Sequence, residues 1–301
     1  MRLGLRVAAG LALFTLVVWY ADPAQLLAKL RNADPRLFVL AVAIAVVANL
    51  VSAARWAVIA RGLGLTAPTG RLILMYARGI TTNILLPGAT LSGDLLRSVQ
   101  LSRLGNPFVA SALSVFLDRF SGLWTLCVLS LLSAATMLAR GEIDRIRLGW
   151  YVLGLCALVA APFVPLRWRG MRSAAIPLLS KFAKAWDRGQ ERLRQARPAL
   201  VASVWRSLAV QFLSAGTLWV CALAVGVSLS YPVMLAAAAP IFIMAALPIG
   251  VAGFGTRELA AVVVLGVAGV STDHAIATAL LYGLTSVMQG LLSAPFFLTR
   301  S

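Results

Sequence analysis

Charged residues are scarce in this sequence, and acidic ones are the scarcest. Only 12% of the 301 residues are charged, and 10 of them are Asp or Glu. The single histidine, His274, leaves no partners for a multi-histidine metal site. The three cysteines, Cys127, Cys156 and Cys221, lack the spacing of a disulfide framework or a zinc site. We therefore expect no metal, no cofactor and no enzymatic activity.

Apolar residues dominate instead. They make up 60% of the chain, and the mean hydropathy is +0.89, a balance that no water-facing surface of ordinary size tolerates. The sequence therefore predicts a multi-pass protein of the bacterial inner (cytoplasmic) membrane. In a soluble protein, the net charge of +17 would suggest nucleic acid as the partner. In a membrane protein, the excess follows from Lys and Arg in cytoplasmic loops, so we expect membrane lipid and no nucleic acid as the partner.

Six apolar stretches are long enough to cross a hydrocarbon core of about 30 Å. They are residues 3–20, 37–60, 109–137, 148–166, 200–225 and 275–298. The first could also be a cleaved signal peptide, but Trp19 and Tyr20 resemble an interfacial anchor and favour a retained span. Proline and glycine interrupt two further stretches, 72–104 and 233–270. The predicted fold is an all-α polytopic membrane protein with about six full transmembrane helices and two re-entrant or broken helical hairpins.

Basic residues set the expected topology. Residues 167–198 hold nine Lys or Arg against Asp187 and Glu191, with aromatic residues between them. This pattern favours an amphipathic helix on the inner leaflet over a plain cytoplasmic loop. Both termini are then cytoplasmic. We expect one integral membrane domain over 1–301: a first half (1–166), the basic segment (167–198) and a second half (199–301).

The two interruptions resemble each other. Each begins with Leu-Pro, continues through glycines and reaches an arginine, Arg97 in the first and Arg257 in the second. With the topology above, the two hairpins enter the membrane from opposite sides, as in an inverted repeat. Their irregular backbone must line protein or water, and free N–H groups at half-helix starts attract anions. The predicted hairpin-backbone residues are Pro87, Gly88, Gly93, Pro248, Gly250, Gly253 and Gly255.

Charged side chains within the predicted membrane region give a candidate binding site. An intramembrane arginine is costly unless it faces a polar cavity or a counter-charge, so such residues point to function. The alternative is structural pairing of Asp94 with Arg97 and of Glu258 with Arg119. Arg78 and Arg206, near predicted span ends, are expected to be interfacial anchors. The candidate substrate-binding residues are Asp94, Arg97, Asp118, Arg119, Arg257 and Glu258.

Three motifs in order carry a resemblance to a known family. They are Leu-Leu-Pro-Gly followed by Ser-Gly-Asp-Leu-Leu-Arg-Ser, then Phe-Leu-Asp-Arg at 116–119, then Pro-Ile-Gly-Val-Ala-Gly-Phe-Gly-Thr-Arg-Glu at 248–258. The chain from about residue 37 resembles the flippase-like transmembrane family of lysylphosphatidylglycerol synthases. One departure is Ala89-Thr90-Leu91, where a more glycine-rich turn is typical. The chain stops at Ser301, so we expect no synthase domain.

The resemblance implies movement of a lipid between leaflets but does not choose the lipid. The arginines and the free N–H groups at the half-helix starts favour an anionic headgroup. One alternative is an accessory protein that binds a lipid and presents it to a membrane enzyme. Another, a membrane-embedded transferase, would need closely placed carboxylates or a histidine. A homodimer or a complex with a lipid-modifying enzyme is left open, as are the lipid itself, its direction and proton coupling.

Overall fold

The computed structural model describes residues 23–85, 91–139, 152, 154–156, 177–247 and 253–299, without the side chains of residues 23, 25 and 177–196. These residues form helices, with no strand among them. The helices are α2 (Pro23–Arg31), α3 (Pro35–Gly62), α4 (Thr69–Leu85), α5 (Leu91–Ser102), α6 (Phe108–Ala139), α8 (Pro177–Ala224), α9 (Tyr231–Ala246), α10 (Thr256–Val267), α11 (Thr272–Ser293) and the 3₁₀ helix η3 (Ala294–Phe297). The predicted all-α fold class is confirmed.

Four described helical stretches are long and apolar enough to cross a membrane. They are Pro35–Gly62, Phe108–Met137, Arg197–Ala224 and Thr272–Phe297, and they match the predicted spans 37–60, 109–137, 200–225 and 275–298. The predicted span 3–20 and almost all of 148–166 lie outside the described residues, so the count of six stays a prediction. The chain is a multi-pass membrane protein.

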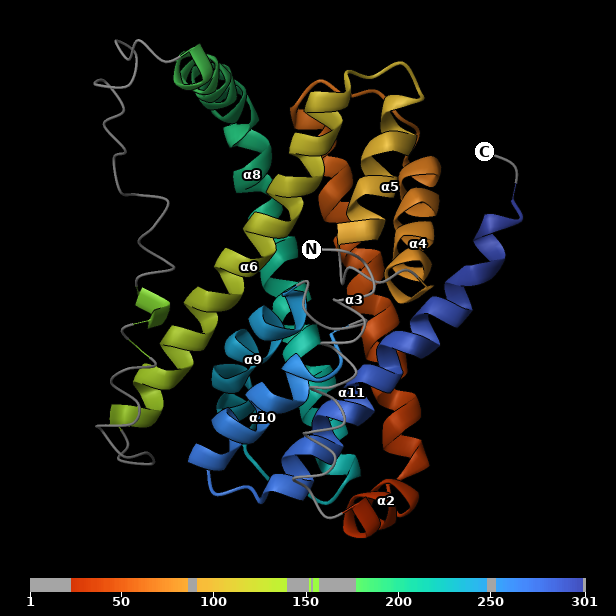
Figure 1. Ribbon diagram of the computed structural model, residues 1–301, viewed down its shortest axis with the longest axis vertical. Helices are drawn as coiled ribbons and strands as arrows, with labels where there is room; N and C mark the ends of the chain where they lie inside the picture. Colours follow the sequence, from red (N-terminus) through yellow and green to blue (C-terminus); the bar gives the residue numbers. More distant parts are fainter. Residues whose placement is uncertain are drawn as a thin grey trace.

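Local sequence explains where the spanning helices begin and bend. Asp34 caps α3, since its carboxylate accepts hydrogen bonds from the backbone N–H groups of Arg36 (2.7 Å) and Leu37 (3.4 Å). Pro198 lies inside α8, where it removes a backbone donor. Figure 1 shows the N-terminal part of α8 turned away from the rest of that helix. This part is the described portion of the basic segment, and its place on the membrane surface stays a prediction.

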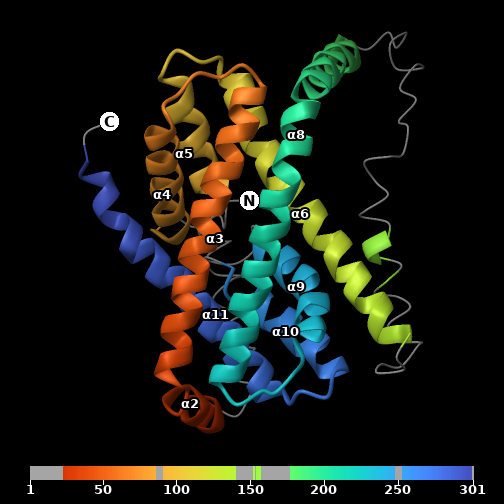
Figure 2. The same cartoon turned by 180° about the vertical axis from the view of Figure 1, so that it is seen from behind.

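Two helix pairs form the interrupted hairpins. Helices α5 and α10 have 12 residues each, which makes them about 18 Å long, too short for the hydrocarbon core. Figures 1 and 2 show the α4–α5 hairpin in the upper half of the molecule and the α9–α10 hairpin in the lower half, with their inner ends at mid-height. The hairpins therefore enter from opposite ends, as predicted.

The packing of the helices repeats between the two halves. In each half a long helix is followed by a hairpin and a second long helix: α3, α4–α5 and α6, then α8, α9–α10 and α11. Helices α3 and α8 pack along each other, α4 packs on α11, and α9 packs on α6. Exchanging the halves converts the α4–α11 contact into the α9–α6 contact. The arrangement is that of an inverted repeat.

Hydroxyl groups and small side chains hold the two halves together. Ser130 and Ser133 on α6 donate to the backbone carbonyls of Leu235 (2.8 Å) and Pro232 (2.7 Å) on α9. In the equivalent place, Thr81 on α4 donates to the carbonyl of Gly290 on α11 (3.0 Å). Small residues let helices approach closely, and hydroxyl groups bond between them when lipid offers no competing water. These bonds fix each hairpin against the long helix of the opposite half.

Candidate functional site

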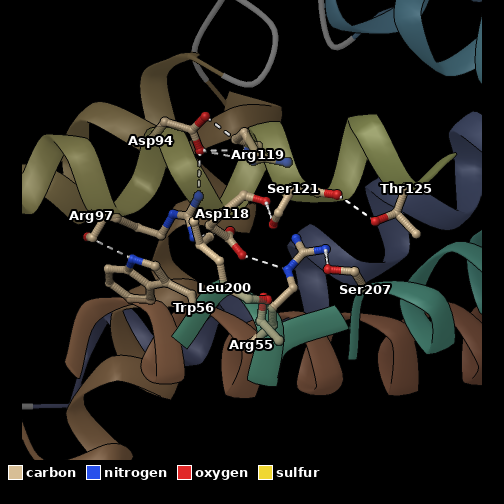
Figure 3. A network of polar contacts seen from close by, with 12 residues as sticks. Arg55, Trp56, Asp94, Arg97, Asp118, Arg119, Ser121, Thr125, Leu200 and Ser207 are labelled. Atoms are coloured by element: carbon tan, nitrogen blue, oxygen red, sulfur yellow. Dashed lines mark hydrogen bonds and ion pairs between the residues drawn. The ribbon is translucent and has the colours of Figure 1, made fainter. Parts of the chain in front are cut away.

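A chain of five charged side chains crosses the interior of the first half (Figure 3). The Arg55 Nε on α3 lies 2.9 Å from Asp118 Oδ1 on α6, whose other carboxylate oxygen lies 3.3 Å from Arg97 Nη1 on α5. Arg97 Nη2 also lies 2.8 Å from Asp94 Oδ1, which accepts a 2.9 Å hydrogen bond from Arg119 Nη2. We refer to Arg55, Asp94, Arg97, Asp118 and Arg119 as the charge network.

Exposure differs sharply along the charge network. The side chains of Asp118 and Arg97 are 1% and 2% exposed, and that of Arg55 is 5% exposed. At the other end, Asp94 is 16% and Arg119 is 41% exposed. Three arginines face two aspartates, so the network carries a net charge of +1. An anion that binds at the accessible end, beside Arg119, would balance this extra positive charge.

Arg97 is held by aromatic rings as well as by carboxylates. Its guanidinium carbon lies 4.9 Å from the ring centre of Trp56 and 4.6 Å from that of Tyr76, distances at which a cation is attracted by the ring face. The Trp56 Nε1–H donates to Ser114 (3.1 Å), which fixes the indole. Gly79 makes room for Arg97, because a Cβ there would lie 3.2 Å from its Cγ. The position of Arg97 is therefore tightly determined.

The start of α5 is fitted closely to α4. The Gly93 N–H donates to the Asn83 side-chain oxygen (2.7 Å), which satisfies a backbone donor in the first turn. A Cβ on Gly93 would collide with the carbonyl oxygen of Gly79. The glycine predicted from the motif is thus required for helix contact. Pro87, Gly88, Pro248 and Gly250 lie outside the described residues.

The second hairpin carries a smaller, neutral pair. Arg257 Nη2 lies 2.8 Å from Glu258 Oε1, with side-chain exposures of 3% and 0%. Glu258 also accepts the backbone N–H of Gly255, which has a φ of 91°, so it caps α10. The Arg257 guanidinium carbon lies 4.6 Å from the Phe254 ring centre. Gly253 likewise has a positive φ, 78°.

The two ion pairs of the structural alternative have different outcomes. Asp94 pairs with Arg97, which lies three residues later on the same helix. Glu258 does not pair with Arg119, because Glu258 contacts Arg257 and Arg119 contacts Asp94. Glu258 is the third residue of α10. From this position its carboxylate reaches the backbone N–H of the N-cap residue, Gly255.

A central cavity of about 700 Å³ joins the two hairpins. Its lining includes Arg55, Asp94, Arg97 and Arg119 from the charge network and Arg257 from the second hairpin. Asp118 and Glu258 are not among its lining residues, so these carboxylates lie behind the arginines they neutralise. Uncharged polar side chains add hydrogen-bonding groups: Asn49, Ser52, Asn83, Gln211, Ser214, Thr217, Ser286 and Gln289.

One arginine was missed by the sequence analysis and another was misplaced. Arg55 was not among the candidate site residues, yet it lies in the charge network; its place seven residues before the end of α3 is the signal that was available. Arg78 was expected to be an interfacial anchor. Instead it is buried and donates to the backbone carbonyls of Phe296 (2.9 Å) and Thr299 (2.6 Å). It ties α4 to η3 and to the residues just after it.

Re-entrant hairpins from opposite ends, meeting at a charged cavity between long apolar helices, define a multi-pass membrane protein of the inverted-repeat type found among transporters. A model of the family described as the lysylphosphatidylglycerol synthase TM region matches residues 7–293. The chain belongs to this family, and the resemblance stated from its motifs is confirmed for the membrane domain. No curated protein matches the chain. The family associates it with lipid metabolism or transport.

Proposed function

We propose that the protein is a lipid translocase that moves a lipid with an anionic or polar headgroup between the leaflets of the bacterial inner membrane. The observation that carries this proposal is the cavity of about 700 Å³, lined by arginines from both hairpins. Because the hairpins enter from opposite ends, a group bound between them lies within reach of structural elements from both sides of the membrane. No catalytic step is proposed.

Arg119 is the residue best suited to hold the headgroup. Its Nε and Nη2 donate to Asp94, while Nη1 makes no hydrogen bond within the described part of the chain. The side chain is 41% exposed and lines the cavity. A guanidinium with a donor left over binds phosphate oxygens through charge-assisted hydrogen bonds. The net charge of +1 in the network favours an anion at this place.

The rest of the site supports binding without fixing the headgroup tightly. Arg55, Arg97 and Arg257 line the cavity but are each held by a carboxylate. The uncharged amides and hydroxyls nearby can exchange hydrogen bonds with a moving headgroup. A translocase needs such graded binding, because a group held by several unpaired cations would not be released.

Replacing Arg119 with glutamine is expected to slow the exchange of labelled phosphatidylglycerol between leaflets about tenfold or more. The change removes one charge-assisted contact, on the order of 1.5 to 3 kcal/mol, and makes the charge network neutral. Exchange is measured in reconstituted vesicles by the rate at which dithionite, added outside, bleaches fluorescent lipid that starts in the inner leaflet. Asp94 keeps its contact with Arg97 in this variant.

Arg206→Gln is the matched control. Arg206 lies on α8, donates to the carbonyl of Ala202 (3.1 Å) and is not among the cavity-lining residues. Its replacement should leave exchange unchanged. If neither variant alters exchange, the cavity does not carry the headgroup. If wild-type protein binds phosphatidylglycerol but gives no exchange above empty vesicles, the accessory lipid-binding function replaces the translocase.

A further inference from the structure

The wall of the cavity beside Arg119 carries apolar side chains that are exposed. Leu91 and Leu95 on α5 are 56% and 59% exposed, and Phe116 and Leu123 on α6 are 61% and 40% exposed. All four line the cavity. Side chains that line an internal cavity and also remain this open stand at its rim. We call these four residues the apolar rim.

The helical spacing puts Arg119 within the apolar rim. Phe116, Arg119 and Leu123 follow each other at three and four residues, so they share one face of α6, and Leu91 and Leu95 share one face of α5. Figure 1 shows α5 and α6 together on the near side of the molecule, with α3 behind them. Along this face the partly exposed guanidinium and its partner Asp94 interrupt an otherwise apolar surface.

This arrangement fits the surroundings of a membrane. Exposed leucine and phenylalanine side chains on a membrane-embedded helix are in contact with hydrocarbon. An arginine at the same depth costs about 2.5 to 3.5 kcal/mol unless it has polar partners, which Asp94 supplies here. In the described part of the chain, the cavity therefore has an apolar, exposed rim around Arg119.

We propose that the cavity opens sideways into the bilayer between α5 and α6. The occupant is an anionic phospholipid whose phosphate contacts Arg119 and whose acyl chains lie across Leu95 and Phe116. Charge complementarity supports this occupant, because the network has an excess of one positive charge at its exposed end. This proposal rests on the proposed function and adds the route by which the lipid reaches the site.

Photocrosslinking tests the lateral opening. The full-length protein carries the photoreactive amino acid p-benzoylphenylalanine in place of Phe116, in vesicles of equal parts phosphatidylglycerol and phosphatidylcholine. Leu132 on α6 is the matched control position, since it is 60% exposed but not among the cavity-lining residues. Mass spectrometry of the adducts gives the ratio of the two lipids. We expect this ratio to be about tenfold higher at position 116 than at 132.

Further variants make the test specific. Adding Arg119→Gln should lower the ratio at position 116 to that at 132 and leave 132 unchanged. With the photoreactive residue at Leu95, on the facing helix, the lipid ratio should be raised as it is at Phe116. This second position shows that the result does not come from misfolding of one variant. Equal ratios at 95, 116 and 132, or a ratio at 116 that survives Arg119→Gln, would overturn the lateral opening.

Leaflet exchange measured in the same vesicles separates this proposal from the translocase itself. Exchange without lipid enrichment at positions 95 and 116 would show that lipid reaches the cavity elsewhere, while the translocase stands. Enrichment at both positions without exchange would support the lateral site and remove the translocase.

Discussion

Replacing Asp118 with asparagine is expected to lower the free energy of unfolding by about 3 to 5 kcal/mol, the cost of breaking a buried ion pair by removing one partner. Asp118 is 1% exposed and is the only carboxylate within the described charge network that contacts Arg55. Its loss leaves the network with three arginines and a single aspartate. Within the described residues, Arg55 would then face only neutral acceptors, the new amide oxygen and the Ser207 hydroxyl at 3.4 Å.

The midpoint of thermal unfolding in mild detergent measures this effect. Asp273→Asn is the control, because Asp273 is a partly exposed residue in the first turn of α11. Its replacement should cost about 0.3 to 1 kcal/mol through the helix dipole. The prediction is wrong if the two variants lower the midpoint equally. Adding Arg55→Gln to Asp118→Asn should restore part of the loss, since it removes an unpaired buried charge.

The charge network is an unfavourable way to stabilise a fold. Apolar side chains of similar volume often replace buried ion pairs with no loss, or with a gain, of stability. A purely structural role also does not explain why three arginines are set against two aspartates, or why one end of the network opens into the cavity. Both features follow if the network is kept to bind an anion. Under the proposed function, the network serves anion binding at some cost to stability.

The hairpins and most of the charge network could be predicted from the sequence. Proline and glycine interrupt the apolar stretches beside Asp94 and Arg97, and Asp118-Arg119 lies in the middle of an otherwise apolar span. The local sequence pattern was enough here, because a charged side chain within a long apolar run must face a partner or a polar cavity inside the membrane.

The remainder depends on contacts between distant segments. Arg55 is close to Arg61 in sequence and resembles a residue at a span end, and its pairing with Asp118 on α6 places it in the network. Arg78 is bound by backbone carbonyls at the end of η3, which no side-chain pattern reveals. The rings around Arg97 come from α3 and α4 and carry no local signal of their contact.

The two halves differ in what occupies equivalent places. Asp118 and Arg119 lie ten and eleven residues after the first residue of α6, and Tyr282 and Gly283 hold the same places in α11. Gly283 leaves room that the guanidinium of Arg257 fills. The first half therefore builds a charged site, and the second half builds an aromatic and glycine surface around a neutral pair. Under the proposed function, the charge that favours an anion lies in the first half.

Replacing Gly93 with alanine is expected to destabilise the first hairpin by about 1 to 3 kcal/mol, the usual cost of overpacking. The new methyl group would overlap the backbone carbonyl of Gly79 on α4 and lie 2.6 Å from the Asn83 side-chain oxygen. A side chain can rotate away, but a helix backbone cannot. Relief would therefore require α5 to move from α4, which carries Asp94 and Arg97 away from Arg119 and Asp118.

Gly70→Ala separates this effect from that of glycine replacement in general. Gly70 lies in the same hairpin, in the first turn of α4, and a Cβ there meets nothing within 4 Å. Alanine at this position should be neutral or stabilise the helix by about 0.5 to 1 kcal/mol. Thermal unfolding and phosphatidylglycerol exchange are measured for both variants. Because a shift of α5 also disrupts the ion pairs, Gly93→Ala should lower both readouts. Exchange that persists at the wild-type rate in a destabilised Gly93→Ala protein would show that lipid movement does not depend on the charge network.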